Sequence, residues 1–203
     1  MVPPSYEPQL AVAGAPTLPL VGWTVEPKLD GWRVQVAVSP SLDAGVRITT
    51  RSGRPITSQV TGLDGLVGAG YEVVVDAELV AGDGSAPSFY GVAPALARRG
   101  HAEPVGLAVF DLLWCEGHEL VGLPDRDRRR VLEDLALPGV VVVPRFDPAD
   151  ADTLLGCCER LGVEGLVLKQ LAAPYRPGRR STAWRKLKCS HWRSQHAPRR
   201  RPR

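Results

Sequence analysis

The sequence predicts a mixed α+β fold whose sheets are largely antiparallel. Strand-like runs outnumber helical ones along the 203 residues, and neighbouring strands are often joined by short turns of the kind that form hairpins. No internal repeat and no long linker interrupts this order, so most of the chain is expected to form one continuous unit.

The first strands are expected to form a hairpin. Apolar residues alternate over 32–38 (WRVQVAV), the run 45–50 (GVRITT) follows, and the turn-rich SPSLDA lies between them. A short helical or looped stretch is expected over 58–69, and YEVVVDAELV at 71–80 is the clearest strand of the chain.

The second part alternates helices and strands. The elements expected in order are a helix over 88–99, a strand over 104–114 that ends in the turn CEGHE, a helix over 125–136, a strand over 139–145, a helix over 148–161, a strand over 164–169, a Pro/Gly/Arg loop over 174–183 and a last strand near 184–188.

Composition indicates a globular protein without a membrane span or a leader. The sequence has no apolar run of 18 or more residues, and its first 20 residues lack the basic region of a signal peptide. We therefore expect a cytoplasmic protein. The four cysteines contain no CxxC pair, which favours reduced structural thiols over a zinc site, and Cys189 with His191 supplies only half of such a site.

Positive charge is concentrated at the C-terminal end. The net charge is +3, but residues 189–203 carry five arginines and no acid, which leaves 20 basic against 22 acidic residues in 1–188. A basic segment suits a polyanionic partner such as nucleic acid. The alternative is a solubilising, disordered end.

Lysine is rare in this chain. Arginine accounts for 21 of the 25 basic residues, and the lysines are Lys28, Lys169, Lys186 and Lys188. A lysine ammonium can lose its proton and become a nucleophile, or act as a compact point charge on phosphate, whereas arginine stays protonated. We therefore expect these lysines to perform tasks that arginine cannot, with chance retention as the alternative for any single one.

Lys28 lies in the polar segment EPKLDGWR, residues 26–33. The proline and the Asp-Gly pair of this segment favour a tight turn, which would expose the lysine at a strand edge. A flexible surface lysine is the usual explanation for such a position. The charges of Glu26, Asp30 and Arg33 weaken that explanation, because they can set the protonation of an amine nucleophile and position a charged ligand.

Two carboxylates project from one face of the clearest strand. Because side chains alternate along a strand, Asp76 and Glu78 share one face, and Val75, Ala77 and Leu79 share the other. Such a pair could hold Mg²⁺ or Mn²⁺, or bind ribose hydroxyls. A solvated surface is the alternative.

Charges suited to phosphate gather near the last strands. Glu164 opens an apolar strand that Lys169 closes, and in STAWRKLKCS the ammonium groups of Lys186 and Lys188 share one strand face with Trp184. Their mutual repulsion favours an anion such as a phosphate chain between or above them. The preceding YRPGRRS adds three arginines that can bind phosphate or sugar.

In this order the segments resemble the nucleotidyltransferase domain of ATP-dependent DNA ligases, and particularly the small bacterial ligases of the end-joining type. Six elements within residues 23–188 carry the resemblance. They are KxDGxR at Lys28–Arg33, RxG at Arg51–Gly53, the acidic strand at Asp76–Leu79, FDLL at Phe110–Leu113, EGLVxK at Glu164–Lys169 and WxKxK at Trp184–Lys188. KxDGxR alone is moderately specific, whereas six elements in the family's order and at compatible spacing are a strong signal.

The resemblance implies a fold and a division of the chain. The expected fold is a ligase-type, ATP-grasp-like α+β domain with two antiparallel sheets, flanking helices and ATP in the groove between the sheets. Residues 1–20 would form a Pro-rich N-terminal extension, residues 21–188 the adenylation domain, and residues 189–203 a basic, disordered tail.

The resemblance also implies roles for the site residues. Lys28 would attack the α-phosphate of ATP and hold AMP as a phosphoramidate. The other implied roles are Glu26 at the adenine edge, Phe110 stacked on the ring, Glu78 on the ribose or a metal, Arg33, Arg51 and Arg180 on the nucleotide, Glu164 on a divalent metal (Mg²⁺ or Mn²⁺), and Lys186 and Lys188 on the α-phosphate. Lys169 receives the least specific assignment.

Two departures from the family pattern qualify these expectations. The acidic strand contains DAEL where the family more often has DGEL. Only 15 residues follow Lys188, whereas in these ligases an oligonucleotide-binding barrel follows WxKxK. We therefore expect an isolated adenylation domain that acts on nicked double-stranded DNA in repair or recombination, with a separate oligonucleotide-binding or end-joining protein as partner.

Two other functions stay open at this point. A non-catalytic nucleotide- or DNA-binding remnant would not need an intact Lys28 with its associated charges. An RNA ligase or capping-type nucleotidyltransferase would share the lysine chemistry, although FDLL and WxKxK are more typical of the DNA enzymes.

Overall fold

The structure is a computed structural model and describes residues 2–81 and 105–190. Its strands are β1 (Leu10–Ala13), β2 (Trp23–Lys28), β3 (Trp32–Val38), β4 (Val46–Thr50), β5 (Val73–Ala81), β6 (Val105–Cys115), β7 (His118–Glu119), β8 (Val141–Val142), β9 (Gly165–Gln170) and β10 (Arg180–Lys188). The helices are α1 (Asp64–Gly68), α3 (Asp125–Asp134) and α4 (Ala151–Leu161), with 3₁₀ turns η1 (Thr57–Gln59) and η2 (Pro148–Asp150).

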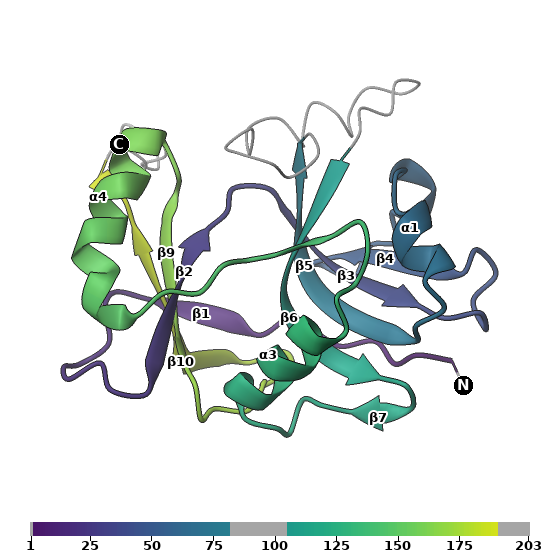
Figure 1. The fold of residues 1–203 in the computed structure, drawn as a ribbon, viewed down its shortest axis with the longest axis horizontal. Helices are drawn as coiled ribbons and strands as arrows, with labels where there is room; N and C mark the ends of the chain where they lie inside the picture. Colours follow the sequence, from purple (N-terminus) through teal and green to yellow (C-terminus); the bar gives the residue numbers. More distant parts are fainter. Residues whose placement is uncertain (1, 82–104, 191–203) are drawn as a thin grey trace, which may run out of the picture.

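A four-stranded sheet forms one half of the molecule, in the order β1-β10-β9-β2 (Figure 1). Its strands pair antiparallel except β1, which runs parallel to β10. Helix α4 covers the outer face of this sheet, where Val25, Leu166 and Leu168 pack with Cys158 of the helix. Gly162 ends α4 in the left-handed conformation that is typical of a helix C-terminus.

The second half is a larger sheet in the order β4-β3-β5-β6-β7, with the two-residue strand β8 parallel to β6. Its outer face carries the main core, in which Val75 and Leu107 of the sheet pack with Leu66 of α1 and Leu132 of α3. Figure 1 shows the two sheets side by side, with α4 and α1 at opposite ends of the molecule. The expected fold of two largely antiparallel sheets with flanking helices is confirmed.

Aromatic residues join the inner faces of the two sheets. Trp184 of β10 and Tyr175 pack with Val74, Leu113 and Trp114 of the larger sheet. Because side chains alternate along each strand, the apolar residues of β2, β9 and β10 that enter the outer core leave charged residues on the inner face. The polar groups predicted to share strand faces therefore point between the sheets.

Most predicted elements are present in the structure, with two corrections. The strand expected over 139–145 is only Val141–Val142, because Pro144 has no N–H for a ladder and the chain there crosses from β6 to β2, where Phe146 bridges Val25. The loop expected over 174–183 ends earlier, since β10 begins at Arg180 and pairs with β1. The helix expected over 88–99 lies outside the described residues.

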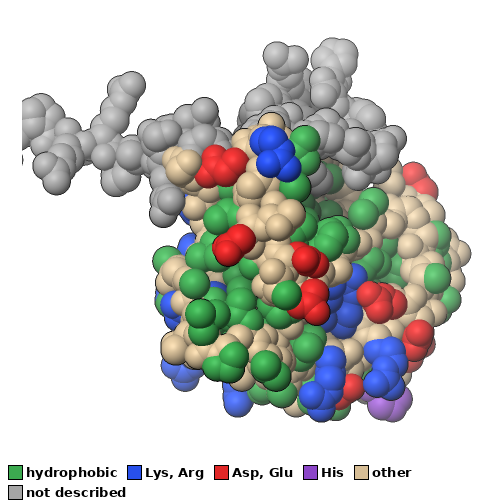
Figure 2. All heavy atoms as spheres, turned by 60° about the vertical axis from the view of Figure 1, so that its left-hand side comes forward, with side chains coloured by type: hydrophobic (Ala, Val, Ile, Leu, Met, Phe, Trp, Pro, Cys, Tyr) green, Lys and Arg blue, Asp and Glu red, His purple; other side chains and the backbone are tan. Residues whose placement is uncertain are grey.

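The surface carries scattered hydrophobic side chains. Figure 2 shows them on the face that carries α4 and the smaller sheet, interrupted by isolated acidic and basic side chains. Within the described residues, the large hydrophobic side chains with the highest exposure are Val21, Leu18, Val2 and Leu161. Single exposures of this kind are ordinary. Among the helices in 2–81 and 105–190, none is long and apolar enough to cross a membrane.

The N-terminal segment that the sequence sets apart as an extension is joined to both sheets. Tyr6 donates its backbone N–H to Gln35 Oε1 of β3, and Leu10 donates to the Arg179 carbonyl beside β10. Gln9 is fully buried, and its carbonyl accepts a hydrogen bond of 2.7 Å from Arg33 Nη1. Residues 6–10, which precede the boundary expected at residue 20, therefore pack with the same two sheets as the residues that follow it.

Deletion of residues 2–14 is expected to destabilise the fold. It removes β1 and leaves Nη1 of the half-buried Arg33 without its acceptor, which together should lower the free energy of unfolding by about 2–4 kcal/mol. Urea denaturation followed by circular dichroism measures the change. Val21→Ser, at an exposed position after β1, is the control and should unfold as the wild type does. Equal unfolding curves for the deletion and the wild type would contradict a structural role for the segment.

Candidate active site

A cavity of about 860 Å³ lies between the inner faces of the two sheets. Residues from both sheets line it. All ten predicted site residues are among them: Glu26, Lys28, Arg33, Arg51, Glu78, Phe110, Glu164, Arg180, Lys186 and Lys188. Lys169 and Trp184 also contribute to the lining. The resemblance to the ligase family implies that these residues share one site, and the structure brings them together.

Lys28 stands at the end of β2 next to a paired carboxylate. Its Nζ lies 2.6 Å from Glu164 Oε2, while Lys188 Nζ lies 2.5 Å from Glu164 Oε1. The strand register explains this arrangement, because Lys28 of β2 and Lys188 of β10 both pair with Gly165 of the central strand β9. Glu164 precedes Gly165 directly, so one buried carboxylate carries two ammonium groups from opposite neighbours.

The turn after Lys28 requires glycine at residue 31. A Cβ at Gly31 would lie 2.0 Å from the Leu79 carbonyl oxygen of β5, which no side chain tolerates. This close approach lets the Gly31 N–H donate a 3.1 Å hydrogen bond to Glu78 Oε1. The Asp-Gly pair therefore does more than form a turn: it fixes the carboxylate of Glu78 beside Lys28.

Glu78 is a buried carboxyl group of the cavity with a raised pKa. Burial raises the pKa of Glu78 to about 7, and the charge of Lys28 and the Gly31 N–H only partly offset that effect. At neutral pH the free protein is therefore a mixture of the protonated and ionised forms of Glu78. The charge of a cation at this site would favour the ionised form.

Arg33 is held in a fixed orientation at the cavity wall. Its Nε and Nη2 donate to Asp76 at 2.9 and 2.6 Å, and its guanidinium lies over the rings of Phe110 and Trp184 at 5.3 and 5.6 Å. Asp76 also accepts a 2.7 Å hydrogen bond from the Tyr175 hydroxyl and is fully buried. The solvated face considered for Asp76 is therefore wrong, and its carboxylate orients Arg33.

The remaining basic residues surround the open part of the cavity. Burial lowers the pKa of Lys186, and the charges of Lys28, Lys188 and Arg180 lower it further. Arg180 donates to the Ala11 carbonyl at 2.7 Å. Arg51 is exposed and directly follows β4, at the end of the strand away from the β3–β4 turn. This local excess of positive charge suits a bound polyanion.

A buried charge cluster extends from the cavity wall into the protein, and one of its members, Arg145, was not predicted from the sequence. Glu26 Oε1 is 2.9 Å from Arg145 Nε, and Glu26 Oε2 is 2.7 Å from Lys169 Nζ. Arg145 also pairs with Asp125 at 2.8 Å. The scarcity of lysine signalled Lys169, whereas no local pattern signalled Arg145, which is 119 residues from Glu26.

The family model described as "ATP dependent DNA ligase domain" matches residues 17–188. The chain belongs to the ATP-dependent DNA ligase domain family. The "Multifunctional non-homologous end joining protein LigD" of Mycobacterium bovis is 36% identical over 176 residues, which cover 85% of this chain and 22% of that relative. A "Probable DNA ligase" of Anaeromyxobacter dehalogenans is 38% identical over 181 residues, which cover 82% of this chain and 34% of that relative.

The solved structures agree with the family membership. The structure named "mycobacterial DNA ligase D complexed with ATP and MES" matches with a TM-score of 0.75 and 33% identity, over 90% of this chain and 60% of that one. The ligase fold predicted by resemblance is therefore confirmed. The chain spans about a fifth to a third of the length of the curated relatives it matches.

The pKa of Glu78 predicts a pH-dependent stability in the absence of metal and nucleotide. The folded state holds the proton up to about pH 7 and the unfolded state only to about 4.5, so the contribution is complete below pH 4.5 and is lost as the pH rises through 7. Urea denaturation in EDTA should show the wild type losing about 1–3 kcal/mol relative to Glu78→Gln between about pH 5 and pH 8. Asp134→Asn, at the exposed last residue of α3, should follow the wild type. Parallel curves for the wild type and Glu78→Gln would contradict the raised pKa.

Proposed function

We propose that this domain transfers AMP from ATP to its own Lys28 and then to the 5′-phosphate of nicked DNA. The observation that carries the proposal is the position of Lys28 in the cavity, next to Glu164, with Lys186 and Lys188 on β10 of the same sheet, at the other side of β9. In the first step a bond forms between Lys28 Nζ and the α-phosphorus, the bond to the leaving oxygen breaks, and pyrophosphate departs. The nucleophile must first lose a proton, since only the free amine attacks.

The lining residues support distinct roles toward the nucleotide. Glu26 and Phe110 lie at the deep end and would contact the adenine edge and face. Glu78 would bind the ribose or a metal, and Lys186 and Lys188 would neutralise charge on the α-phosphate. Arg51 and Arg180 would contact the nucleotide from the rim. Arg33 already donates to Asp76 through Nε and Nη2 and to the Gln9 carbonyl through Nη1, so it would contact the nucleotide with the second N–H of Nη1.

A divalent cation fits the carboxylates of this site. Glu164 and Glu78 offer hard oxygen ligands, and Mg²⁺ is commonly held by one or two carboxylates together with phosphate oxygens and water. Within 2–81 and 105–190 there is no cluster of three or more acidic, histidine or cysteine ligands. Mg²⁺ or Mn²⁺ there would polarise the phosphate and neutralise developing charge. Glu164 would exchange its contact with Lys28 for the cation.

The DNA substrate and the partners follow from the family. End joining is in the name of the Mycobacterium bovis relative, so we propose nick sealing in repair or recombination in the cytoplasm, with a separate oligonucleotide-binding or end-joining protein as partner. A non-catalytic remnant is disfavoured by the complete set of charges around Lys28. An RNA substrate is the second candidate, because the lysine chemistry would be the same.

Incubation with α-labelled ATP and Mg²⁺ tests the first step. The wild type should acquire one covalent AMP that is acid-labile, as a phosphoramidate is. Lys28→Ala and Lys28→Arg should both lose the label, and the arginine variant keeps the positive charge next to Glu164, so its loss isolates nucleophilicity. Arg126→Ala, at an exposed position of α3, is the control and should keep full labelling. Label that persists in both Lys28 variants would overturn the proposal.

Sealing of a nicked duplex tests the later steps. The Nζ–P bond breaks as AMP passes to the 5′-phosphate, and the 3′-hydroxyl then attacks that phosphate and releases AMP. The wild type, loaded with AMP, should join nicked DNA faster than nicked RNA of the same sequence, and a separately supplied oligonucleotide-binding domain should raise the rate. Glu164→Gln should reduce sealing at least tenfold, because it weakens metal binding at the phosphate. The measurement is product formation on denaturing gels. Preference for the RNA nick would assign the domain to RNA ligation instead.

A further inference from the structure

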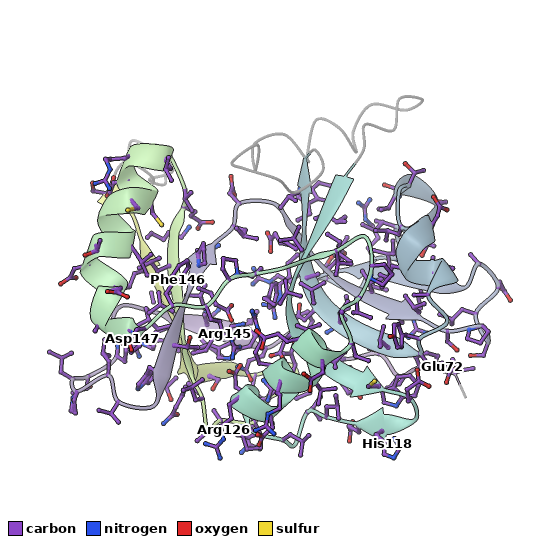
Figure 3. The ribbon with its side chains drawn as sticks, in the orientation of Figure 1. Glu72, His118, Arg126, Arg145, Phe146 and Asp147 are labelled. Atoms are coloured by element: carbon purple, nitrogen blue, oxygen red, sulfur yellow. The ribbon has the colours of Figure 1, made fainter. Side chains whose placement is uncertain are left out.

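Arg145 lies on the chain segment that crosses between the two sheets. Its neighbours fix this segment at both ends, since Val143 donates to the Val109 carbonyl of β6 and Phe146 pairs with Val25 of β2. Figure 3 shows Arg145 on this connection, while Phe146 and Asp147 continue toward α4. Val143 lines the cavity, so the side chain of Arg145 starts two residues from the cavity wall.

The guanidinium of Arg145 is oriented by one carboxylate and presented to another. Asp125, fully buried at the start of α3, binds it through two contacts of 2.8 and 3.1 Å. Its Nε then donates to Glu26 Oε1 at 2.9 Å. A planar guanidinium held in this way has a single orientation, so the position of Glu26 Oε1 is set from α3.

Lys169 holds the second oxygen of Glu26. Its Nζ is 2.7 Å from Glu26 Oε2, donates to the Phe110 carbonyl at 3.0 Å, and lies over the Phe110 and Trp184 rings at 4.8 and 4.6 Å. Each carboxylate oxygen of Glu26 therefore contacts one cation. A carboxylate oxygen held by a cation in this way can accept hydrogen bonds but cannot donate one.

A carboxylate oxygen has room for a second donor. Glu26 is only 2% exposed in the protein, yet it lines the cavity next to Phe110. A base stacked on Phe110 would present its edge to Glu26. An exocyclic amino group there would donate to the carboxylate, whereas a carbonyl at the same place would set an oxygen against a fixed negative charge.

We propose that Arg145 is a positioning residue for base selection, holding Glu26 as a fixed acceptor for the exocyclic amino group of adenine. The inference rests on the proposed function, in which a nucleotide occupies this cavity with its base against Glu26 and Phe110. Arg145 is a sharper probe than Lys169, because the side-chain contacts described for Arg145 are with Glu26 and Asp125 and not with the stacking ring.

Binding of ATP and of ITP tests the proposal, since the base of ITP has a carbonyl where adenine has an amino group. Titration calorimetry in EDTA at neutral pH measures both Kd values without a covalent step. The wild type should bind ATP more tightly than ITP by about tenfold or more. Arg145→Met should weaken ATP binding while leaving ITP binding nearly unchanged, so that the ratio falls toward one. Arg145→Lys should restore part of the ratio.

Two further variants keep the test decisive. Arg126→Met removes an exposed arginine of α3 and should leave the ratio unchanged. Glu26→Gln should lose selectivity as Arg145→Met does, because an amide can present either a donor or an acceptor to the base; this variant serves where Arg145→Met does not fold. Equal weakening of ATP and ITP by Arg145→Met, or an unchanged ratio in Glu26→Gln, would overturn the proposal.

The outcomes separate this inference from the proposed function. Base-selective binding that depends on Arg145, without AMP transfer to Lys28, would support the inference and contradict the adenylation activity. Covalent labelling of Lys28 with selectivity that ignores Arg145 would do the reverse. A wild type that does not distinguish ATP from ITP would overturn the inference directly.

Discussion

Charged side chains lie in the space between the two sheets, and the need to pair them is the constraint on which the structure depends. Both sheets bury apolar cores on their outer sides, so the facing surfaces carry charged residues that water reaches poorly. A buried charge without a partner costs several kcal/mol. Glu26 of β2 and Glu164, directly before β9, are each paired with two cations. The sheets are joined by aromatic contacts and by the hydrogen bond from Lys169 Nζ to the Phe110 carbonyl. The paired charges beside these contacts make the cavity suitable for a nucleotide.

The two carboxylates have opposite properties toward a ligand. Glu26 lies deep, and its cations are anchored by Asp125 and by the Phe110 carbonyl, so its position should not change when a base enters. Glu164 is contacted by lysines at the open end, where side-chain exposure is 23% for Lys28 and 36% for Lys188. Long lysine side chains can exchange partners with phosphate at little cost, because their contacts are to single atoms. The deep end therefore provides selectivity, and the outer end provides mobile charge for chemistry.

Strand periodicity accounts for the part of the site that could be predicted from sequence. A period of two places Asp76 with Glu78, and Lys186 with Lys188, on one face, and the structure puts these faces toward the cavity. Periodicity gives no information on pairing between distant strands, so it could not predict the registers that bring Lys28 and Lys188 to Glu164. The irregular register of β6 around Phe110, which sets the direction of that ring, was likewise beyond a local pattern.

The scarcity of lysine now has a structural explanation. All four lysines line one cavity, whereas the 21 arginines are distributed over the chain. Lys169 is 1% exposed and sits where two ring faces and two oxygen atoms converge, a space that suits a compact ammonium better than a planar fork. Arg145, by contrast, contacts the carboxylates of Glu26 and Asp125 at the same time, and a planar guanidinium with several N–H donors suits that task. The choice between lysine and arginine at each position therefore follows from the geometry that each cation has to satisfy, and the rarity of lysine makes that choice visible in the amino-acid sequence itself.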